Sequence, residues 1–270
     1  MKQNYTQKLI EGNTDPIKKS AKKRVGYGAF YAIAVTFFAY FASQFFGAVI
    51  LAFWARAVGR DAQTTLNGLE TNTALQFGFF LIVEALTIYI IWWFLKRRGN
   101  SFKDIGLQRR PKKSDLGPAI GVFIVYFIAL IAVTALAGSL TGINTDQKQD
   151  LGFTGTKTNL ELIMIFISLV ILPPLAEEIT VRGFLYTGLK AKFSKNIAAI
   201  AASVLFGIAH LQLGNGQAPL WIAAIDTMML SMFLIYLREK TGALWSGMLV
   251  HGLKNGVAFL FLFVLNVSGI

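Results

Sequence analysis

Long apolar runs alternate with short polar segments along most of the chain. Crossing the hydrocarbon core of a bilayer takes about 20 apolar residues as an α-helix, which satisfies its own backbone hydrogen bonds. By that length the sequence predicts an all-α fold, a polytopic transmembrane helix bundle with about seven spans. The candidate spans are residues 27–54, 73–95, 116–140, 160–175, 197–211, 218–237 and 243–267. The fourth and fifth are short, which indicates tilted or incomplete helices.

Composition supports the bilayer as the solvent of this chain. Of its 270 residues, 54% are hydrophobic and only 15% are charged, which leaves too little polar surface to coat a soluble globule. Cysteine is absent. The sequence therefore excludes a disulfide framework, a thiolate zinc site and a cysteine nucleophile.

The net charge of +12 reflects basic residues that cluster just outside apolar runs. Such clusters anchor cytoplasmic segments and attract anionic headgroups, so membrane lipid is a better predicted partner than nucleic acid. By the positive-inside rule the N-terminus and the loop after the second span are cytoplasmic. The expected location is a cell membrane, namely a bacterial plasma membrane, which the chain crosses several times. These clusters comprise Lys18, Lys19, Lys22, Lys23 and Arg24, then Lys96, Arg97, Arg98, Lys103, Arg109, Arg110, Lys112 and Lys113.

Three parts are predicted along the chain: a basic cytoplasmic segment (1–26), N-terminal transmembrane helices (27–157) and a catalytic transmembrane core (158–270). The loop segment 101–115 mixes apolar and basic residues. It is either a segment on the membrane surface or a solvated loop. The oligomeric state cannot be read from the sequence.

Ionisable side chains at bilayer depth are costly, so each one within an apolar run is a candidate for function. The chain has two histidines, and both fall in this set. The candidates are Glu84, Glu177, Glu178, Arg182, His210, Asp226, His251 and Lys254.

The first cluster follows a pair of prolines, Pro173 and Pro174. Proline cannot donate to the helical ladder, so the pair should kink or restart the helix and leave two carboxylates near a fresh first turn. Glu178 and Arg182 are four residues apart and share a helical face, which suits an internal ion pair. Glu177 points elsewhere and is predicted to face a cavity as a general base. A helix-end salt-bridge cluster is the alternative.

The other two clusters place a histidine on each of two later spans. Phe206 precedes His210 by four residues, and His251 precedes Asn255 by four. Because that spacing puts both members on one helical face, His251 and Asn255 can converge on a developing oxyanion. The alternative for each histidine is an interhelical hydrogen bond or an interfacial position.

Together these residues resemble the CAAX prenyl protease and bacteriocin-processing family of intramembrane endopeptidases, over roughly residues 160–255. The resemblance implies peptide-bond hydrolysis in a membrane-associated or secreted peptide or protein, as in bacteriocin self-immunity or peptide maturation. It also implies that Glu178 with Arg182 orients the site. The matching patterns are E-E-x-x-x-R at Glu177, Glu178 and Arg182, F-x-x-x-H at Phe206 and His210, and H-x-x-x-N at His251 and Asn255.

Carried over by position, Glu177 would activate a water molecule with help from His210. His251 and Asn255 would hold the tetrahedral oxyanion. Family members are often labelled metalloproteases, and Glu177, His210 and His251 are the residues that zinc would use. Because H-E-x-x-H is absent, a site that requires no cofactor is the favoured reading.

Two other classes of function stay open. A non-catalytic immunity or scaffold protein would bind a peptide toxin or a secretion partner without using Glu177. A proton-coupled transporter would use Glu84, Asp226 and Glu177 as relay carboxylates, although no inverted repeat is apparent. Ser246 lacks the sequence setting of a serine nucleophile.

Overall fold

The computed structural model describes residues 25–145, 147, 152–153, 157–212 and 218–265. Within these ranges every regular element is a helix and none is a strand, so the predicted all-α fold is confirmed. The basic residues Lys18 to Arg24, most of the predicted segment 1–26 and the predicted end of the last span lie outside the described residues.

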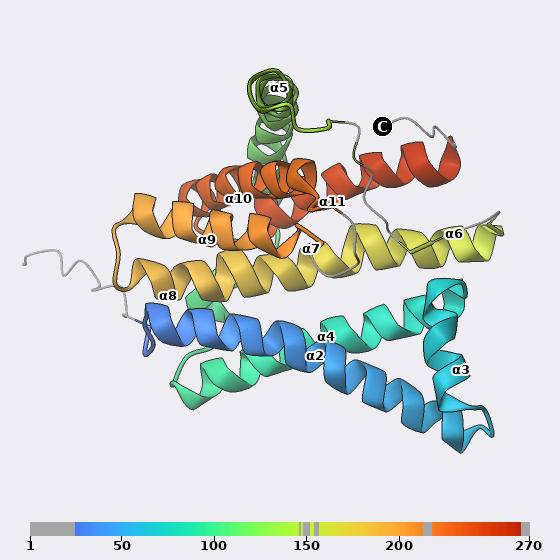
Figure 1. Cartoon of the computed structure of the whole chain (residues 1–270). Helices are drawn as coiled ribbons and strands as arrows, with labels where there is room; N and C mark the ends of the chain where they lie inside the picture. Colours follow the sequence, from blue (N-terminus) through green and yellow to red (C-terminus); the bar gives the residue numbers. More distant parts are fainter. Residues whose placement is uncertain (1–24, 146, 148–151, 154–156, 213–217, 266–270) are drawn as a thin grey trace, which may run out of the picture.

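Among the described residues, six α-helices of 15 residues or more stand beside one long composite helix (Figure 1). The first group comprises α2 (Ala29–Ala57), α4 (Thr73–Arg97), α5 (Leu116–Thr141), α9 (Lys195–Ala209), α10 (Trp221–Thr241) and α11 (Trp245–Phe259), which continues into the π-helical η6 (Leu260–Val264). The composite comprises α6 (Asn159–Phe166), η4 (Ile167–Ile171), α7 (Leu172–Glu177), η5 (Glu178–Leu185) and α8 (Tyr186–Lys190). Short turns are α3 (Ala62–Asn67), η1 (Gly68–Glu70), η2 (Phe102–Ile105) and η3 (Lys113–Asp115).

Six helices in the described part of the chain are long and apolar enough to cross a membrane. The seventh, α9, has 15 residues and is therefore about 22 Å long, which is shorter than a hydrocarbon core of about 30 Å. Six full spans and one short one agree with the predicted number of about seven. The predicted end of the fourth span at residue 175 is wrong, because that helix continues to Lys190.

The fourth span continues because its paired prolines lie where the helix can accommodate them. Pro173 and Pro174 occupy the first positions of α7, where a missing N–H is tolerated. The π-helical stretches η4 and η5 lie on either side of α7. The prolines therefore change the type of helix from one turn to the next without ending it.

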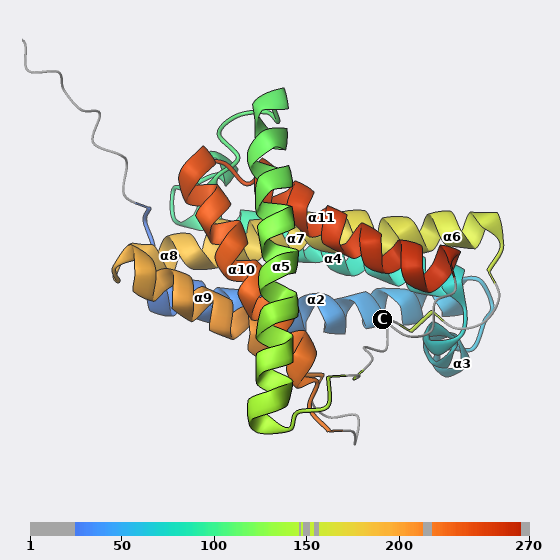
Figure 2. The same cartoon turned by 90° about the horizontal axis from the view of Figure 1, so that it is seen from above.

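Two groups of helices cross one another in Figures 1 and 2. The α6–α8 helix runs in the same general direction as α2 and α4, whereas α5 runs across them. α10 packs against α5, α9 and α11, and α11 also contacts η4 and α7. The crossing brings α7, η5 and α11 together in the middle of the molecule, where the candidate site lies.

The outer surface of the helices is apolar, as expected for lipid-facing helices. Large hydrophobic side chains with more than two thirds of their area exposed include Phe30, Phe53, Ile131 and Leu140. Inside, a core cluster surrounds η5 and α8 and draws side chains from α2, α4 and α9. The multi-pass membrane assignment rests on these faces and on the six long helices.

The loop between α4 and α5 is folded against the rest of the molecule. Ile105 at its centre is fully buried and lies against Gly183 of η5. Trp245 Nε1 donates a hydrogen bond to the Arg109 carbonyl at 2.7 Å, and the Leu244 amide donates to the Gly106 carbonyl at 3.1 Å. This packing supports the helix that carries the predicted glutamates. The exposed residues of the loop are compatible with both predicted settings, the membrane surface and solvent.

Candidate active site

Glu178 and Arg182 form the predicted ion pair inside η5. Their Oε1 and Nη1 atoms are 2.9 Å apart, and the two side chains are 1% and 0% exposed. The Arg182 guanidinium also lies 4.2 Å from the centre of the Phe206 ring, which provides a cation–π contact. The charge of Arg182 is thus compensated from one side by a carboxylate and from the other by an aromatic face.

His251 of α11 lies between the two glutamates. Its Nδ1 is 3.1 Å from Glu178 Oε1, and its Nε2 is 3.7 Å from Glu177 Oε2. The first distance is a hydrogen bond and the second is beyond one. Gly247, one turn earlier, permits this approach because a Cβ there would lie 3.1 Å from Glu178 Oε2.

The cluster contains buried polar atoms that have no hydrogen-bond partner among the described residues. They include the Oε2 atoms of Glu177 and Glu178 and the Nε and Nη2 atoms of Arg182. An unsatisfied buried group costs free energy, and such groups in a folded protein require an explanation such as a catalytic role. Glu177 differs from its neighbour because its side chain is 30% exposed. Part of the Glu177 side chain can therefore be reached from outside the cluster, whereas its Oε2 atom is buried beside His251.

His210 lies at the C-terminal end of α9 and is half-buried. Its Nδ1 is 2.8 Å from the Phe206 carbonyl oxygen, and its ring centre is 4.6 Å from that of Phe206. The Phe206 ring also meets His251 edge-on at 6.3 Å. Phe206 therefore separates the two histidines, and no hydrogen bond or ion pair between described residues joins His210 to Glu177.

Asn255 shares a helical face with His251, but its amide is engaged elsewhere. Its Nδ2 donates a hydrogen bond to the Leu169 carbonyl in η4 at 2.9 Å. The predicted convergence of the His251 and Asn255 side chains on one target is therefore not formed in this structure. The oxyanion role of Asn255 stays a prediction.

The candidates outside the motifs belong to two different environments. Asp226 accepts a hydrogen bond from Tyr126 and lies 3.0 Å from Lys254 Nζ through its other oxygen, which links α5, α10 and α11. Glu84 of α4 is half-buried and within electrostatic range of Glu177. Sequence reasoning gave both carboxylates a role only in the transporter alternative. Sequence reasoning missed Tyr126. A polar hydroxyl within the most apolar span could have indicated that this tyrosine has a buried partner.

Ser246 and the zinc hypothesis can both be compared with this geometry. Ser246 is buried and donates a hydrogen bond to the Asp115 carbonyl at 3.1 Å, so it holds the loop onto α11. Among the described residues no group of three or more His, Cys, Asp or Glu side chains is arranged to hold a metal ion. The predicted zinc ligands Glu177, His210 and His251 are not assembled, since Phe206 lies between the two histidines.

The fold and the cluster define a polytopic helical membrane protein that holds two glutamates, an arginine and a histidine together among its helices. Residues 159–257 match the family model described as Type II CAAX prenyl endopeptidase Rce1-like. No curated protein and no solved structure matches the chain. The match confirms the predicted resemblance to the CAAX protease family, covers all seven motif residues and indicates a CAAX-type protease. Helices α2, α4 and α5 lie outside it.

Proposed function

We propose that the protein is an intramembrane endopeptidase in which a water molecule activated by Glu177 hydrolyses a peptide bond. The observation that carries this proposal is the division of labour between two adjacent glutamates. Glu178 is buried and already bound by Arg182 and His251, so it orients the site. Glu177 is partly exposed and its Oε2 has no hydrogen-bond partner, so it is available as a general base.

In the proposed reaction Glu177 accepts a proton from water while the water oxygen forms a bond to the carbonyl carbon of the substrate. The carbonyl oxygen becomes a tetrahedral oxyanion. When the carbon–nitrogen bond breaks, the proton held by Glu177 passes to the leaving amine. The immediate products are a carboxylic acid and an amine, and transfer of the acid's proton to the amine gives a carboxylate and an ammonium group, with only water consumed.

His251 is positioned to stabilise the oxyanion. Its Nδ1 is hydrogen-bonded to Glu178, so its Nε2 lies on the side of Glu177, where an Nε2–H would donate to the oxyanion. His210 can help to activate the water only if a bound water or substrate group bridges the Phe206 ring, or if α9 moves His210 closer to Glu177.

The proposed substrate is a membrane-associated or secreted peptide or protein that reaches Glu177 from within the membrane. Bacteriocin self-immunity and peptide maturation are the biological settings that the family resemblance favours. Zinc is not required for the steps above. Cleavage that disappears with a chelator and returns with stoichiometric zinc would replace this scheme by metal catalysis.

The test compares purified wild type with Glu177→Gln, using a prenylated CAAX reporter peptide and a set of bacteriocin and pheromone peptides, with cleavage scored by peptide mass. Removing the general base should lower kcat by roughly a hundredfold or more. Glu70→Gln is the matched control, because this glutamate is exposed in the turn before α4.

Equal cleavage by wild type and Glu177→Gln would refute the mechanism. If no peptide is cleaved but Glu177→Gln cells keep resistance to a peptide toxin, the protein is the non-catalytic immunity protein. Proton-coupled flux in liposomes that Glu177→Gln abolishes would instead favour a transporter.

A further inference from the structure

The Leu169 carbonyl has lost both of its normal partners within its own helix. In an α-helix it would accept a hydrogen bond from the amide of residue 173, and in a π-helix from that of residue 174. Both positions are prolines, which have no N–H. A carbonyl left unpaired at bilayer depth costs several kcal/mol.

Asn255 supplies the missing donor from another helix. Its Nδ2 lies 2.9 Å from the Leu169 oxygen. Gly252 lets α11 come close enough, because a Cβ there would lie 3.2 Å from the Val170 carbonyl oxygen. A Cβ at Gly256 would be in ordinary contact with Val170 Cγ1, at 3.6 Å. The contact is thus a specific seam between α11 and η4.

This seam lies one turn from the candidate active site on both helices. His251 precedes Asn255 by four residues on α11, and Glu177 follows Pro173 by four residues on the broken helix. The Asn255–Leu169 hydrogen bond therefore fixes how far α11 is shifted along the broken helix, and so the position of His251 relative to the two glutamates.

We infer that Asn255 is a positioning residue, which holds α11 against the carbonyl freed by Pro173 and Pro174 and thereby keeps His251 between Glu177 and Glu178. The inference bears on the proposed active site, but its central measurement does not require cleavage. It differs from the oxyanion role that the sequence predicts for Asn255, and the two roles give different results with one double variant.

The natural absence of cysteine permits a direct measurement of the seam. In a Val170→Cys/Gly256→Cys background, oxidation in native membranes should form a cross-link between η4 and α11. Asn255→Ala should slow this cross-link roughly tenfold, as expected when a buried carbonyl loses its partner. Adding Pro173→Ala returns an N–H to the helix, so the Pro173→Ala/Asn255→Ala double variant should regain most of the cross-linking rate.

The control is a cysteine pair at Gly47 and Val83, which lie side by side on α2 and α4: a Cβ at Gly47 would lie 2.8 Å from Val83 Cγ2. The cross-linking rate of this pair should stay constant. Cleavage activity should change in parallel with the cross-linking rate, falling in Asn255→Ala and recovering in the double variant. An unchanged cross-linking rate in Asn255→Ala, or no recovery in the double variant, would overturn the inference. If wild type cleaves nothing, the cross-linking result still decides it.

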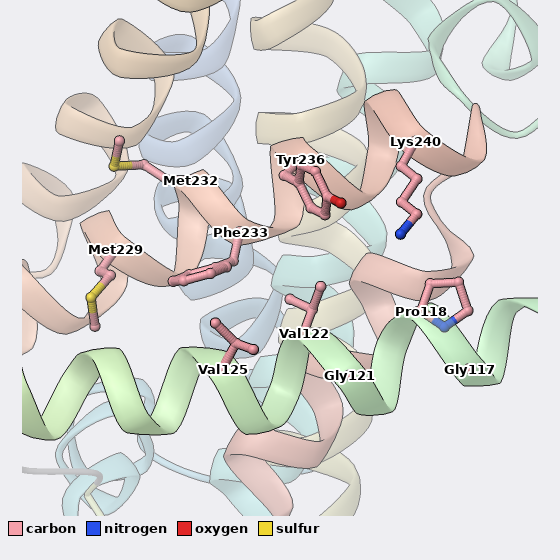
Figure 3. A pocket seen from close by; sticks show the side chains of 10 residues that line it. All are labelled: Gly117, Pro118, Gly121, Val122, Val125, Met229, Met232, Phe233, Tyr236 and Lys240. Carbon is pink, nitrogen blue, oxygen red and sulfur yellow. The ribbon is translucent and has the colours of Figure 1, made fainter.

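An independent observation concerns the groove between α5 and α10, which has a volume of about 850 Å³ (Figure 3). Small residues on α5 open it, and its walls are almost entirely apolar. Lys240 stands at one end, beside Gly117 and Pro118, and no described carboxylate forms an ion pair with it. The lining residues are Gly117, Pro118, Gly121, Val122, Val125, Met229, Met232, Phe233, Tyr236 and Lys240.

We propose that this groove binds one anionic phospholipid, with its headgroup at Lys240 and an acyl chain along the apolar walls. Charge complementarity selects this occupant, because the Lys240 end adjoins the start of α5, where Lys112 and Lys113 are exposed. The nearby acid, Asp115, is already bound by Arg109. The basic end would lie on the cytoplasmic side by the positive-inside rule, where anionic lipids attract such residues.

Native mass spectrometry with phosphatidylglycerol and phosphatidylcholine of equal chain length tests the groove. Wild type should retain phosphatidylglycerol several-fold better. Lys240→Ala should remove that preference, Lys103→Ala should preserve it as a charge-matched control, and Gly121→Leu should reduce binding of both lipids. Equal retention of the two lipids by wild type, or an unchanged preference in Lys240→Ala, would overturn the proposal.

Discussion

Arg182 is the residue on which the charge balance of the site depends most. It is fully buried, and its removal leaves Glu178 in a low-dielectric setting with only His251 as a partner. Breaking a buried ion pair from one side typically costs about 3–5 kcal/mol. We therefore expect Arg182→Met to lower thermal stability in detergent far more than Glu178→Gln/Arg182→Met, which removes both charges. A double variant that is less stable than Arg182→Met would contradict this view of the pair.

Gly247 tests how tightly the position of Glu178 is defined. A Cβ at this residue would meet the Glu178 carboxylate at 3.1 Å, so Gly247→Val should displace the carboxylate from His251 and lower cleavage at least tenfold, as misplacement of catalytic groups does. Gly78→Val on α4 is the control, since a Cβ there has open space. Equal rates for the two variants, measured with the same reporter peptide, would show that Glu178 is not held from this side.

At this scale the sequence identified the residues better than their partners. The four-residue spacing of Glu178 and Arg182 correctly predicted an ion pair, because both ends of the contact lie on one helix. The partners of His251 lie on another helix, and the spacing rule carries no information about that packing. For the same reason the spacing rule could not predict the partner of Asn255, which is the Leu169 carbonyl 86 residues earlier.

At the scale of elements, α11 is held against α10 by the pair of Lys254 and Asp226. Their closest atoms are 3.0 Å apart, and both side chains are largely buried. Because Tyr126 also binds Asp226, a neutral partner at either position loosens three helices together. We expect Lys254→Met to reduce the free energy of unfolding by about 1–3 kcal/mol, between the values for exposed and buried pairs.

The measurement is thermal unfolding in detergent, with Lys240→Met as the control because this exposed lysine lacks an ion pair among the described residues. The double variant Asp226→Asn/Lys254→Met should be more stable than Lys254→Met, since no isolated charge remains. A loss of cleavage in Lys254→Met with unchanged stability would assign the lysine to the substrate and not to the helix contact.

Hydropathy located these elements well but misplaced the end of the fourth span. The predicted span ended at residue 175, where the apolar run meets charged residues, yet the helix continues for another fifteen residues to Lys190. Two effects outweigh these local signals: π-helical turns accommodate the prolines, and Phe206 and Glu178 compensate Arg182. Both depend on tertiary contacts, which a scan along one chain cannot include.

For the molecule as a whole, orientation in the membrane follows from the distribution of basic residues. The loop after α4 carries the basic cluster and folds onto the turn between α10 and α11, so these segments must share one side of the membrane. The positive-inside rule predicts that this side is cytoplasmic. Glu70, in the turn between α2 and α4, then lies on the opposite side.

Single cysteines in this cysteine-free chain test the orientation. In intact cells an impermeant maleimide should label Glu70→Cys and spare Lys103→Cys, and cell lysis should expose Lys103→Cys to the reagent. The reverse pattern would place the basic loop outside and contradict the charge rule. Because α9 is too short to span the hydrocarbon core, we expect its end at His210 to lie within the bilayer. A substrate that enters beside His210 therefore comes from the side opposite the basic loop if labelling follows the prediction.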